Sequence, residues 1–206
     1  MDLIQEINKL KKSEISKVIK KRLEEFQELN KKDNNEWFSE LCFCILTANS
    51  KAETAIKIQN NIKAKGFLTF PLEKLTHEIK RVGHRFHNNK AKFITEARKY
   101  SKIKDIVYEE IKNKRDPREF IVKKIKGIGW KESSHFLRNV GFHDYAILDR
   151  HIINIMLESK LIKEKPKVLN EKNYFEIEKK FKKIADMKAD ELDLYVWYLK
   201  TNKILK

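Results

Sequence analysis

Apolar residues recur every three or four positions along most of the chain, which is the period of an amphipathic α-helix. The pattern predicts a short helix over 3–10 and a longer one over 15–29. The apolar face of the longer helix consists of Ile15, Val18, Ile19, Leu23 and Phe26. The next segment, 36–48, is apolar almost all round, which is typical of a helix at the centre of a core. Because the chain has only three prolines and five glycines, we expect an all-α protein.

Local start and stop signals mark several helix ends. Ser50 followed by Glu53 has the spacing of a capping box, which predicts a helix that starts there and ends at Gly66. Asp116 before Pro117 is a strong helix start, because the aspartate caps free N–H groups and proline suits the first turn.

Three of the five glycines, Gly127, Gly129 and Gly141, fall close together in a lysine-rich, helix-favouring sequence. Helical spacing on both sides of KGIGW predicts a tight reversal between two helices, with Gly141 ending the second. Without a Cβ on Gly127 and Gly129, the reversal can expose successive backbone N–H groups, a geometry suited to a phosphate. Lys126 lies just before the turn, so we expect it to flank the same anion.

The charge of the chain narrows the choice of partner. Lysine and arginine number 46 against 30 aspartates and glutamates, which gives a net charge of +16 and a pI of about 9.6. Binding to a polyanion is the leading inference. No apolar run approaches the roughly 20 residues that span a bilayer, and the N-terminus lacks a secretory signal. We therefore expect no membrane association and an intracellular protein of the cytoplasm or nucleoid.

The two cysteines, Cys42 and Cys44, fall in the predicted central helix and are expected to be small core residues. The six histidines do not combine with them in a metal-ligand spacing. We therefore predict neither a metal nor a cofactor. At 206 residues the chain can form one large domain or two small ones with a core.

The glycine turn, Gly127-Ile128-Gly129, is followed by Lys131 and later by Asp149, at the predicted start of another helix. This order resembles the helix-hairpin-helix signature of the DNA glycosylase superfamily. The resemblance implies that Lys131 is a nucleophile toward a deoxyribose C1′, and that Asp149 stabilises the positive charge formed as the base leaves. Taken singly, Lys131 could be one lysine among many and Asp149 only a helix cap. The joint pattern favours catalysis.

Two loops resemble DNA-contacting loops of the same superfamily. Asn49 and Ser50 follow the central helix, and the resemblance implies that they reach the minor groove, near the orphaned cytosine. His84, Arg85 and Phe86 follow a glycine and precede KA, and the resemblance implies side chains that fill the gap left by an extruded nucleotide. From the residues alone, Asn49 could simply end a helix, and Phe86 could lie in the core.

The C-terminal region separates two branches of the superfamily. Many endonuclease III relatives carry a four-cysteine iron–sulfur motif there, and the lack of cysteine after Cys44 excludes such a cluster. Helices are predicted within 173–187 and 190–206, and the second holds Trp197 and Lys206. This tail resembles that of the type 2 8-oxoguanine DNA glycosylases, which implies that Trp197 and Lys206 contact the flipped base. Alternatively, Trp197 is a core aromatic residue and Lys206 a frayed end.

The combined interpretation is an all-α fold of two helical lobes that flank a basic cleft and carry a helix-hairpin-helix motif. One lobe is expected to span 32–125, and the other 1–31 plus 126–206, with the hairpin, catalytic residues and tail. The resemblance implies a monomeric DNA glycosylase and abasic-site lyase that excises 8-oxoguanine from double-stranded DNA through a lysine Schiff base, with strand cutting by β-elimination. The alternatives are an endonuclease III-like enzyme for oxidised pyrimidines and a non-catalytic DNA-binding module.

Overall fold

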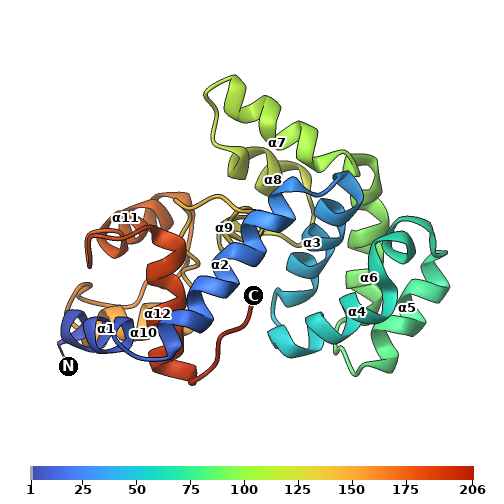
Figure 1. Ribbon diagram of the computed structural model, residues 1–206. Coiled ribbons are helices and arrows are strands. Elements are labelled where there is room, and N and C mark those ends of the chain that lie inside the picture. Colours follow the sequence, from blue (N-terminus) through green and yellow to red (C-terminus); the bar gives the residue numbers. More distant parts are fainter. Residues whose placement is uncertain (1) are drawn as a thin grey trace. The chain divides into compact units, whose positions relative to one another are not determined.

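The computed structural model describes residues 2–206, and the regular structure within that range is helical, without a strand (Figure 1). In chain order the α-helices are α1 (Leu3–Lys11), α2 (Ile15–Lys31), α3 (Asn34–Thr47), α4 (Ala52–Thr69), α5 (Leu72–Arg81), α6 (His87–Ala97), α7 (Ile103–Lys112), α8 (Pro117–Lys124), α9 (Trp130–Asn139), α10 (Arg150–Glu158), α11 (Glu171–Phe181) and α12 (Ala189–Thr201). A short 3-10 helix, η1 (Arg98–Tyr100), follows α6. The all-α class predicted from the apolar periodicity is confirmed.

The chain forms two compact units. Leu29–Phe136 makes one, which we call the hairpin unit, and Leu137–Lys206 with the residues up to Glu28 makes the other, the terminal unit. The unit boundaries fall within α2 and α9. These bounds put the glycine turn in the same unit as the central helices. The lobe of 32–125 expected from the sequence stays a prediction.

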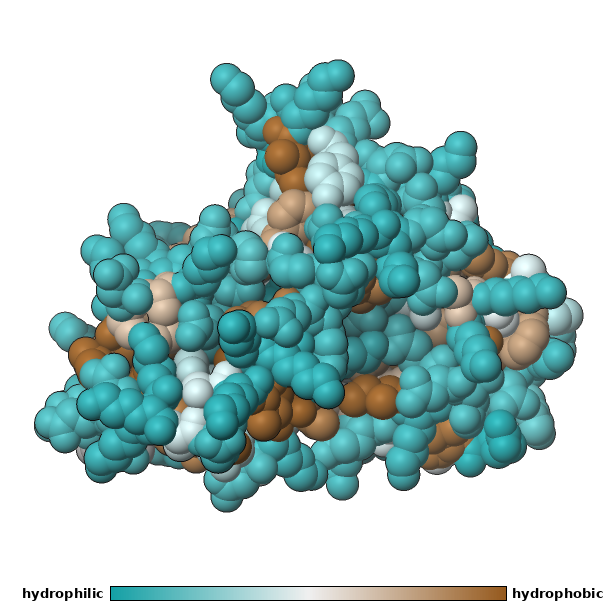
Figure 2. Space-filling model, in the orientation of Figure 1, coloured by the Kyte–Doolittle hydropathy of each residue, from teal (hydrophilic) through white to brown (hydrophobic). Residues whose placement is uncertain are grey.

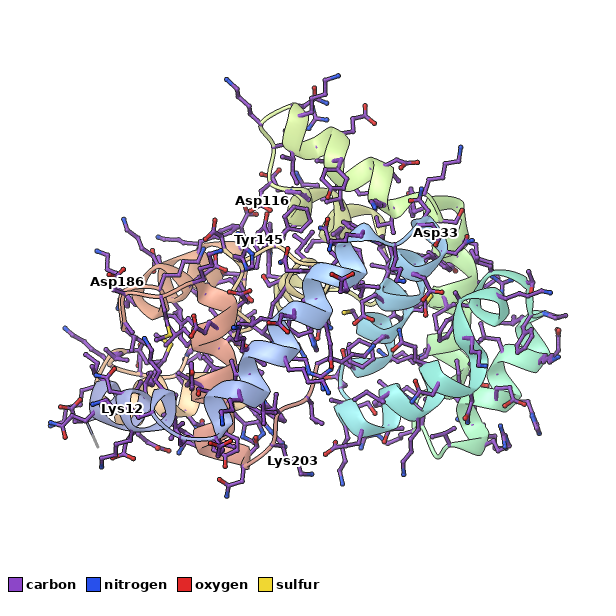
Figure 3. The ribbon with its side chains drawn as sticks, in the orientation of Figure 1. Lys12, Asp33, Asp116, Tyr145, Asp186 and Lys203 are labelled. Atoms are coloured by element: carbon purple, nitrogen blue, oxygen red, sulfur yellow. The ribbon has the colours of Figure 1, made fainter. Side chains whose placement is uncertain are left out.

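Helix α3 lies at the centre of the hairpin unit, as its sequence predicts. Asp33 caps it, because its carboxylate accepts two backbone N–H groups of the first turn (Figure 3). Every residue from Trp37 to Thr47 is buried, and α4, α6 and α7 pack against the helix. Cys42 and Cys44 are core residues, and burial raises the pKa of the Cys42 thiol well above its ordinary value.

The capping box predicted for α4 is wrong. The helix begins one residue later than expected, with Lys51 at its N-cap and no side-chain capping bond. The cause lies in the preceding turn, since Asn49 adopts a positive φ of 60° and the Ser50 N–H bonds to the Thr47 carbonyl at 3.0 Å. Ser50 thus completes the turn that ends α3, so it does not cap α4.

The predicted end of α4 at Gly66 is also wrong. Gly66 is buried inside the helix, where an added Cβ would meet the Ile62 side chain at 2.8 Å. Its lack of a side chain therefore serves packing rather than termination. The irregular point is Lys63, whose φ of 57° and ψ of 172° kink the helix before it continues to Thr69.

The terminal unit is built from α1, α10, α11, α12 and the first part of α2, and α12 packs against both α1 and α10. The apolar face predicted for α2 is narrower than its spacing suggested. Ile19 and Phe26 are buried, whereas Val18 is 48% exposed. The periodicity shows that Val18 and Ile19 lie on one side of the helix, but it does not show which of them a neighbouring helix covers.

The helix that leads into the hairpin, α8, begins at the predicted signal. Asp116 caps α8 by accepting the Arg118 N–H at 2.9 Å, with Pro117 in the first turn (Figure 3). Arg118 is buried, pairs with Asp116 at 2.7 Å and donates to the Ser134 hydroxyl of α9 at 3.2 Å. This arginine therefore ties the first helix of the hairpin to the second.

Hydrophilic residues, in teal, cover most of the face seen in Figure 2. None of the helices within residues 2–206 combines the length and apolarity that crossing a bilayer requires.

Gly127 is the position of the hairpin that depends most on glycine. Its φ is +82°, and an added Cβ would meet the Phe93 ring at 2.5 Å. We predict that Gly127→Ala lowers the free energy of unfolding by roughly 2–4 kcal/mol, since left-handed strain and a steric clash add together. Urea denaturation measures this change.

Gly83 supplies the matched control, because its φ is +85° and nothing lies within 4 Å of an added Cβ. Gly83→Ala should cost only the conformational strain, about 1–2 kcal/mol. An equal loss of unfolding free energy in the two variants would show that a clash with Phe93 does not contribute to the cost at Gly127.

Candidate active site and DNA interface

Lys131 lies in the first turn of α9, directly after the glycine turn. Its Nζ pairs with Oε1 of Glu132 at 2.9 Å, and its side chain is 27% exposed. The other oxygen of Glu132, Oε2, accepts the Gly129 N–H at 3.1 Å, as in one half of a capping box. One carboxylate therefore holds both the hairpin backbone and the candidate nucleophile.

A second lysine lies close to this group. Lys90 of α6 is buried, and its Nζ donates to the Ile45 carbonyl at 2.6 Å. Burial lowers the pKa of Lys90 to about 8; the charge of Glu132 opposes this shift and that of Lys131 adds to it. We call Lys90, Lys131 and Glu132 the amine cluster.

The sequence predicted part of this arrangement. A helix follows the glycine turn as expected, and Lys131 lies in its first turn because the helix begins at Trp130. The role of Glu132 was missed, and its spacing of three residues after Gly129 was the available signal. No local signal could have shown that Lys90 lies near Lys131, because the two are brought together by the packing of separate helices.

Asp149 caps α10, as predicted. Its Oδ1 accepts the N–H groups of His151 at 2.8 Å and Ile152 at 2.9 Å. Its Oδ2 accepts the indole N–H of Trp197, from α12, at 3.2 Å. Asp149 and Trp197 both belong to the terminal unit, and Lys131 belongs to the hairpin unit.

The segment before Asp149 is not helical, and side chains satisfy its backbone. The Ala146 N–H donates to Glu178 at 3.1 Å, and the Ile147 N–H donates to Asp193 at 3.2 Å. The Tyr174 hydroxyl accepts the Leu148 N–H at 3.3 Å and donates to the Ala146 carbonyl at 2.7 Å. The backbone that leads to Asp149 is thereby fixed by α11 and α12.

The Asp193 carboxyl, which accepts the Ile147 N–H, has a strongly shifted pKa. Burial raises its pKa to about 7; Arg138, paired with it at 2.7 Å, lowers the pKa, and the charge of Asp149 raises it. The negative charge of Asp149 therefore acts on Asp193, and both residues belong to the terminal unit.

The loop that includes His84, Arg85 and Phe86 divides into an inner and an outer part. His84 is 2% exposed, with Nε2 bonded to the Leu46 carbonyl at 2.9 Å and Nδ1 accepting the Phe86 N–H at 3.1 Å. Burial lowers the pKa of His84, in keeping with a neutral ring. Arg85 and Phe86 are exposed, and the guanidinium lies 4.5 Å from the centre of the Phe86 ring. Only the outer two side chains are accessible to a ligand.

The remaining predicted contacts lie at the surface or at the end of the chain. Asn49 is exposed and Ser50 half-buried in the turn after α3. Lys126 is exposed and pairs with Glu96 at 2.9 Å. Trp197 is half-buried on α12, and Lys206 is half-buried beyond that helix. Within residues 2–206 there is no group of three His, Cys, Asp or Glu side chains suited to a metal ion.

A family profile and a full-length relative indicate the same family. The sequence profile of the family described as 8-oxoguanine DNA glycosylase matches residues 19–189. The 8-oxoguanine DNA glycosylase/AP lyase of Methanocaldococcus jannaschii is 52% identical over 209 residues, with 100% of both chains covered.

Two solved structures are similar in fold and sequence. The crystal structure of the Methanocaldococcus jannaschii 8-oxoguanine glycosylase/lyase, in complex with a 15mer DNA containing 8-oxoguanine, gives a TM-score of 0.94 at 50% identity, with 100% of both chains covered. The crystal structure of the 8-oxoguanine DNA glycosylase of Thermotoga maritima gives a TM-score of 0.91 at 40% identity and covers 99% of this chain and 98% of that one. From the profile match and the full-length relative it follows that the chain belongs to the 8-oxoguanine DNA glycosylase family.

Proposed function

We propose that this protein excises 8-oxoguanine from double-stranded DNA and cuts the strand at the resulting abasic site. The observation that carries the proposal is full-length membership of the 8-oxoguanine DNA glycosylase family, together with a partly exposed lysine directly after the glycine turn. The net charge of +16 supports a polyanionic substrate. A single chain supplies all the proposed residues, which fits a monomer. The proposed DNA substrate fits a protein that acts in the nucleoid.

Lys131 is the proposed nucleophile. Its neutral amine attacks C1′ of the damaged nucleotide, the new N–C1′ bond forms, and the bond to the base breaks with its electron pair going to the purine. The purine takes up a proton, and opening of the sugar ring gives the Schiff base. Loss of a C2′ proton then expels the 3′ phosphate by β-elimination, which cuts the strand. Lys90 has its amine engaged inside the fold, so Lys131 is the accessible amine.

Asp149 is the proposed carboxylate of the reaction. Its negative charge stabilises the positive charge that builds on the sugar as the base leaves, and it assists the later proton transfers. Three N–H groups hold its two oxygens, so its orientation is set before the substrate arrives. That fixed orientation favours electrostatic catalysis, because little reorganisation is needed in the transition state.

The proposed DNA contacts fall into two kinds. The phosphate contacts are assigned to the hairpin, at Gly127, Gly129 and Lys126. The Gly129 N–H, which is bonded to Oε2 of Glu132, would exchange that carboxylate for the phosphate. The contacts to bases and to the gap left by extrusion are assigned to Asn49, Ser50, Arg85, Phe86, Trp197 and Lys206. His84, which is buried, is assigned a positioning role beneath Arg85 and Phe86.

Borohydride trapping tests the nucleophile. The wild-type protein should form a covalent adduct with a duplex that carries 8-oxoguanine, and Lys131→Ala should form none, because the reduced Schiff base needs that amine. Lys123→Ala is the matched control, since it removes an exposed lysine of α8, the first helix of the hairpin, and should still trap. If Lys131→Ala still forms an adduct, another amine is the nucleophile, and Lys90 is the first candidate. A duplex with an oxidised pyrimidine, run in parallel, tests the substrate class.

Asp149→Asn tests the carboxylate. Asparagine is an equally good helix cap, so folding and binding to lesion DNA should change little. The single-turnover rate of 8-oxoguanine excision should fall by roughly 100-fold or more, the usual contribution of a charged acid–base group. An unchanged excision rate would remove Asp149 from the mechanism.

Gly129 tests the phosphate contact without disturbing the fold. An added Cβ there meets only the Glu132 carboxylate, at 3.3 Å, so Gly129→Ala should change the free energy of unfolding by less than about 0.5 kcal/mol. The added methyl group would keep a phosphate from the backbone, so the dissociation constants for damaged and undamaged duplexes should rise by a similar factor of roughly ten. Fluorescence anisotropy measures both. A loss confined to the damaged duplex would argue against a phosphate contact.

A further inference from the structure

The indole N–H of Trp197 is engaged with a carboxylate of the protein. It donates to Oδ2 of Asp149 at 3.2 Å across the terminal unit, from α12 to the start of α10. An indole has a single N–H donor, so this bond uses the only polar group of the ring. A base that stacks on Trp197 would therefore meet its flat faces only.

The bond to Trp197 also decides which acceptor site of Asp149 stays open. A carboxylate offers about four acceptor sites, and here Oδ1 takes two backbone N–H groups while Oδ2 takes the indole. Among the described residues, the second lone pair of Oδ2 has no partner. The capping bonds to Oδ1 fix the plane of the carboxylate. The indole N–H occupies one lone pair of Oδ2 and leaves the other open.

Helix α12 holds Asp149 at two points. Asp193 lies one turn before Trp197, on the same face of the helix, and accepts the Ile147 N–H at 3.2 Å. Asp193 is itself held by Arg138 at 2.7 Å. One helix face thus binds both the backbone before Asp149 and the carboxylate of Asp149.

We propose that Trp197 is a positioning residue for Asp149, and that its indole N–H aims the open acceptor site of Oδ2 at the reacting sugar. This inference rests on the proposed catalytic role of Asp149. It adds a connection between two steps, because the ring proposed to stack on the extruded base also orients the carboxylate that acts on the sugar. A base that displaces the indole would break its bond to Oδ2 of Asp149, so correct seating of the base and removal of that base become coupled.

The test separates the N–H group from the aromatic ring. Trp197→Phe keeps an aromatic face, and replacement of Trp197 by 3-benzothienyl-alanine keeps the full ring system with sulfur in place of the N–H. Tyr198→Phe is the matched control, because it removes one hydroxyl from the next aromatic residue of the same helix. Each protein is assayed for melting temperature, affinity for a duplex with 8-oxoguanine, and single-turnover excision rate.

Both replacements of Trp197 should bind the lesion duplex within about threefold of wild type and excise roughly tenfold or more slowly, as expected for loss of a hydrogen bond to a charged group. Tyr198→Phe should excise at the wild-type rate. In the Asp149→Asn background, Trp197→Phe should change the excision rate by less than about twofold, because the group that the N–H orients has already lost its charge.

The outcomes distinguish this inference from the proposed function. If Asp149→Asn excises normally, the role of Asp149 in catalysis fails and the positioning role fails with it. If Asp149→Asn is slow but both Trp197 replacements excise at the wild-type rate, only the positioning role is overturned. An equal loss for Trp197→Phe with and without Asp149→Asn would mean that the ring acts through base binding or folding, and would also overturn it.

Discussion

The segment before Asp149 depends on one constraint: buried backbone that is not helical must find its hydrogen-bond partners outside a helix. Residues 146–148 leave the helical pattern between α9 and α10, so their N–H groups have no helical partners. Glu178, Asp193 and Tyr174 supply those partners. An orphaned buried N–H would cost roughly 1–3 kcal/mol, so these bonds hold the segment in one conformation. The position of Asp149 follows, because it is the next residue and is then locked by its own capping bonds.

The same constraint explains why a charged group such as Asp193 is tolerated inside the terminal unit. Burial disfavours the ionised form of Asp193 and is the largest cause of the rise of its pKa to about 7. The buried Arg138 and the Ile147 N–H compensate in part, at 2.7 Å and 3.2 Å. An apolar residue at this position would remove the desolvation cost but leave both Arg138 and the Ile147 N–H without that partner. The polar group is therefore retained for what it holds in place.

Features set by neighbours in the sequence could be predicted, and features set by packing could not. The caps at Asp116 and Asp149 were predicted correctly because a cap involves residues two or three positions apart. The capping box at Ser50 failed although its spacing was right, because Asn49 turns the chain there and the Ser50 N–H is bonded to the Thr47 carbonyl. The bonds from Lys90 to Ile45 and from Trp197 to Asp149 join residues far apart in sequence, so no local pattern carries them. The general acid–base and DNA roles came from a resemblance; the contacts that orient those groups came only from the structure.

The amine cluster shows how packing selects one lysine for chemistry in a chain with 46 basic residues. Lys90 and Lys131 both interact electrostatically with Glu132, but Lys90 is buried and Lys131 has a partly exposed side chain. Because burial lowers the pKa of Lys90 to about 8, this lysine loses part of its charge near that pH, while its amine stays bound to the Ile45 carbonyl. The positive charge beside Lys131 therefore varies near that pH. The packing of α3 against α6 buries Lys90 and leaves it as a titrating charge beside Lys131.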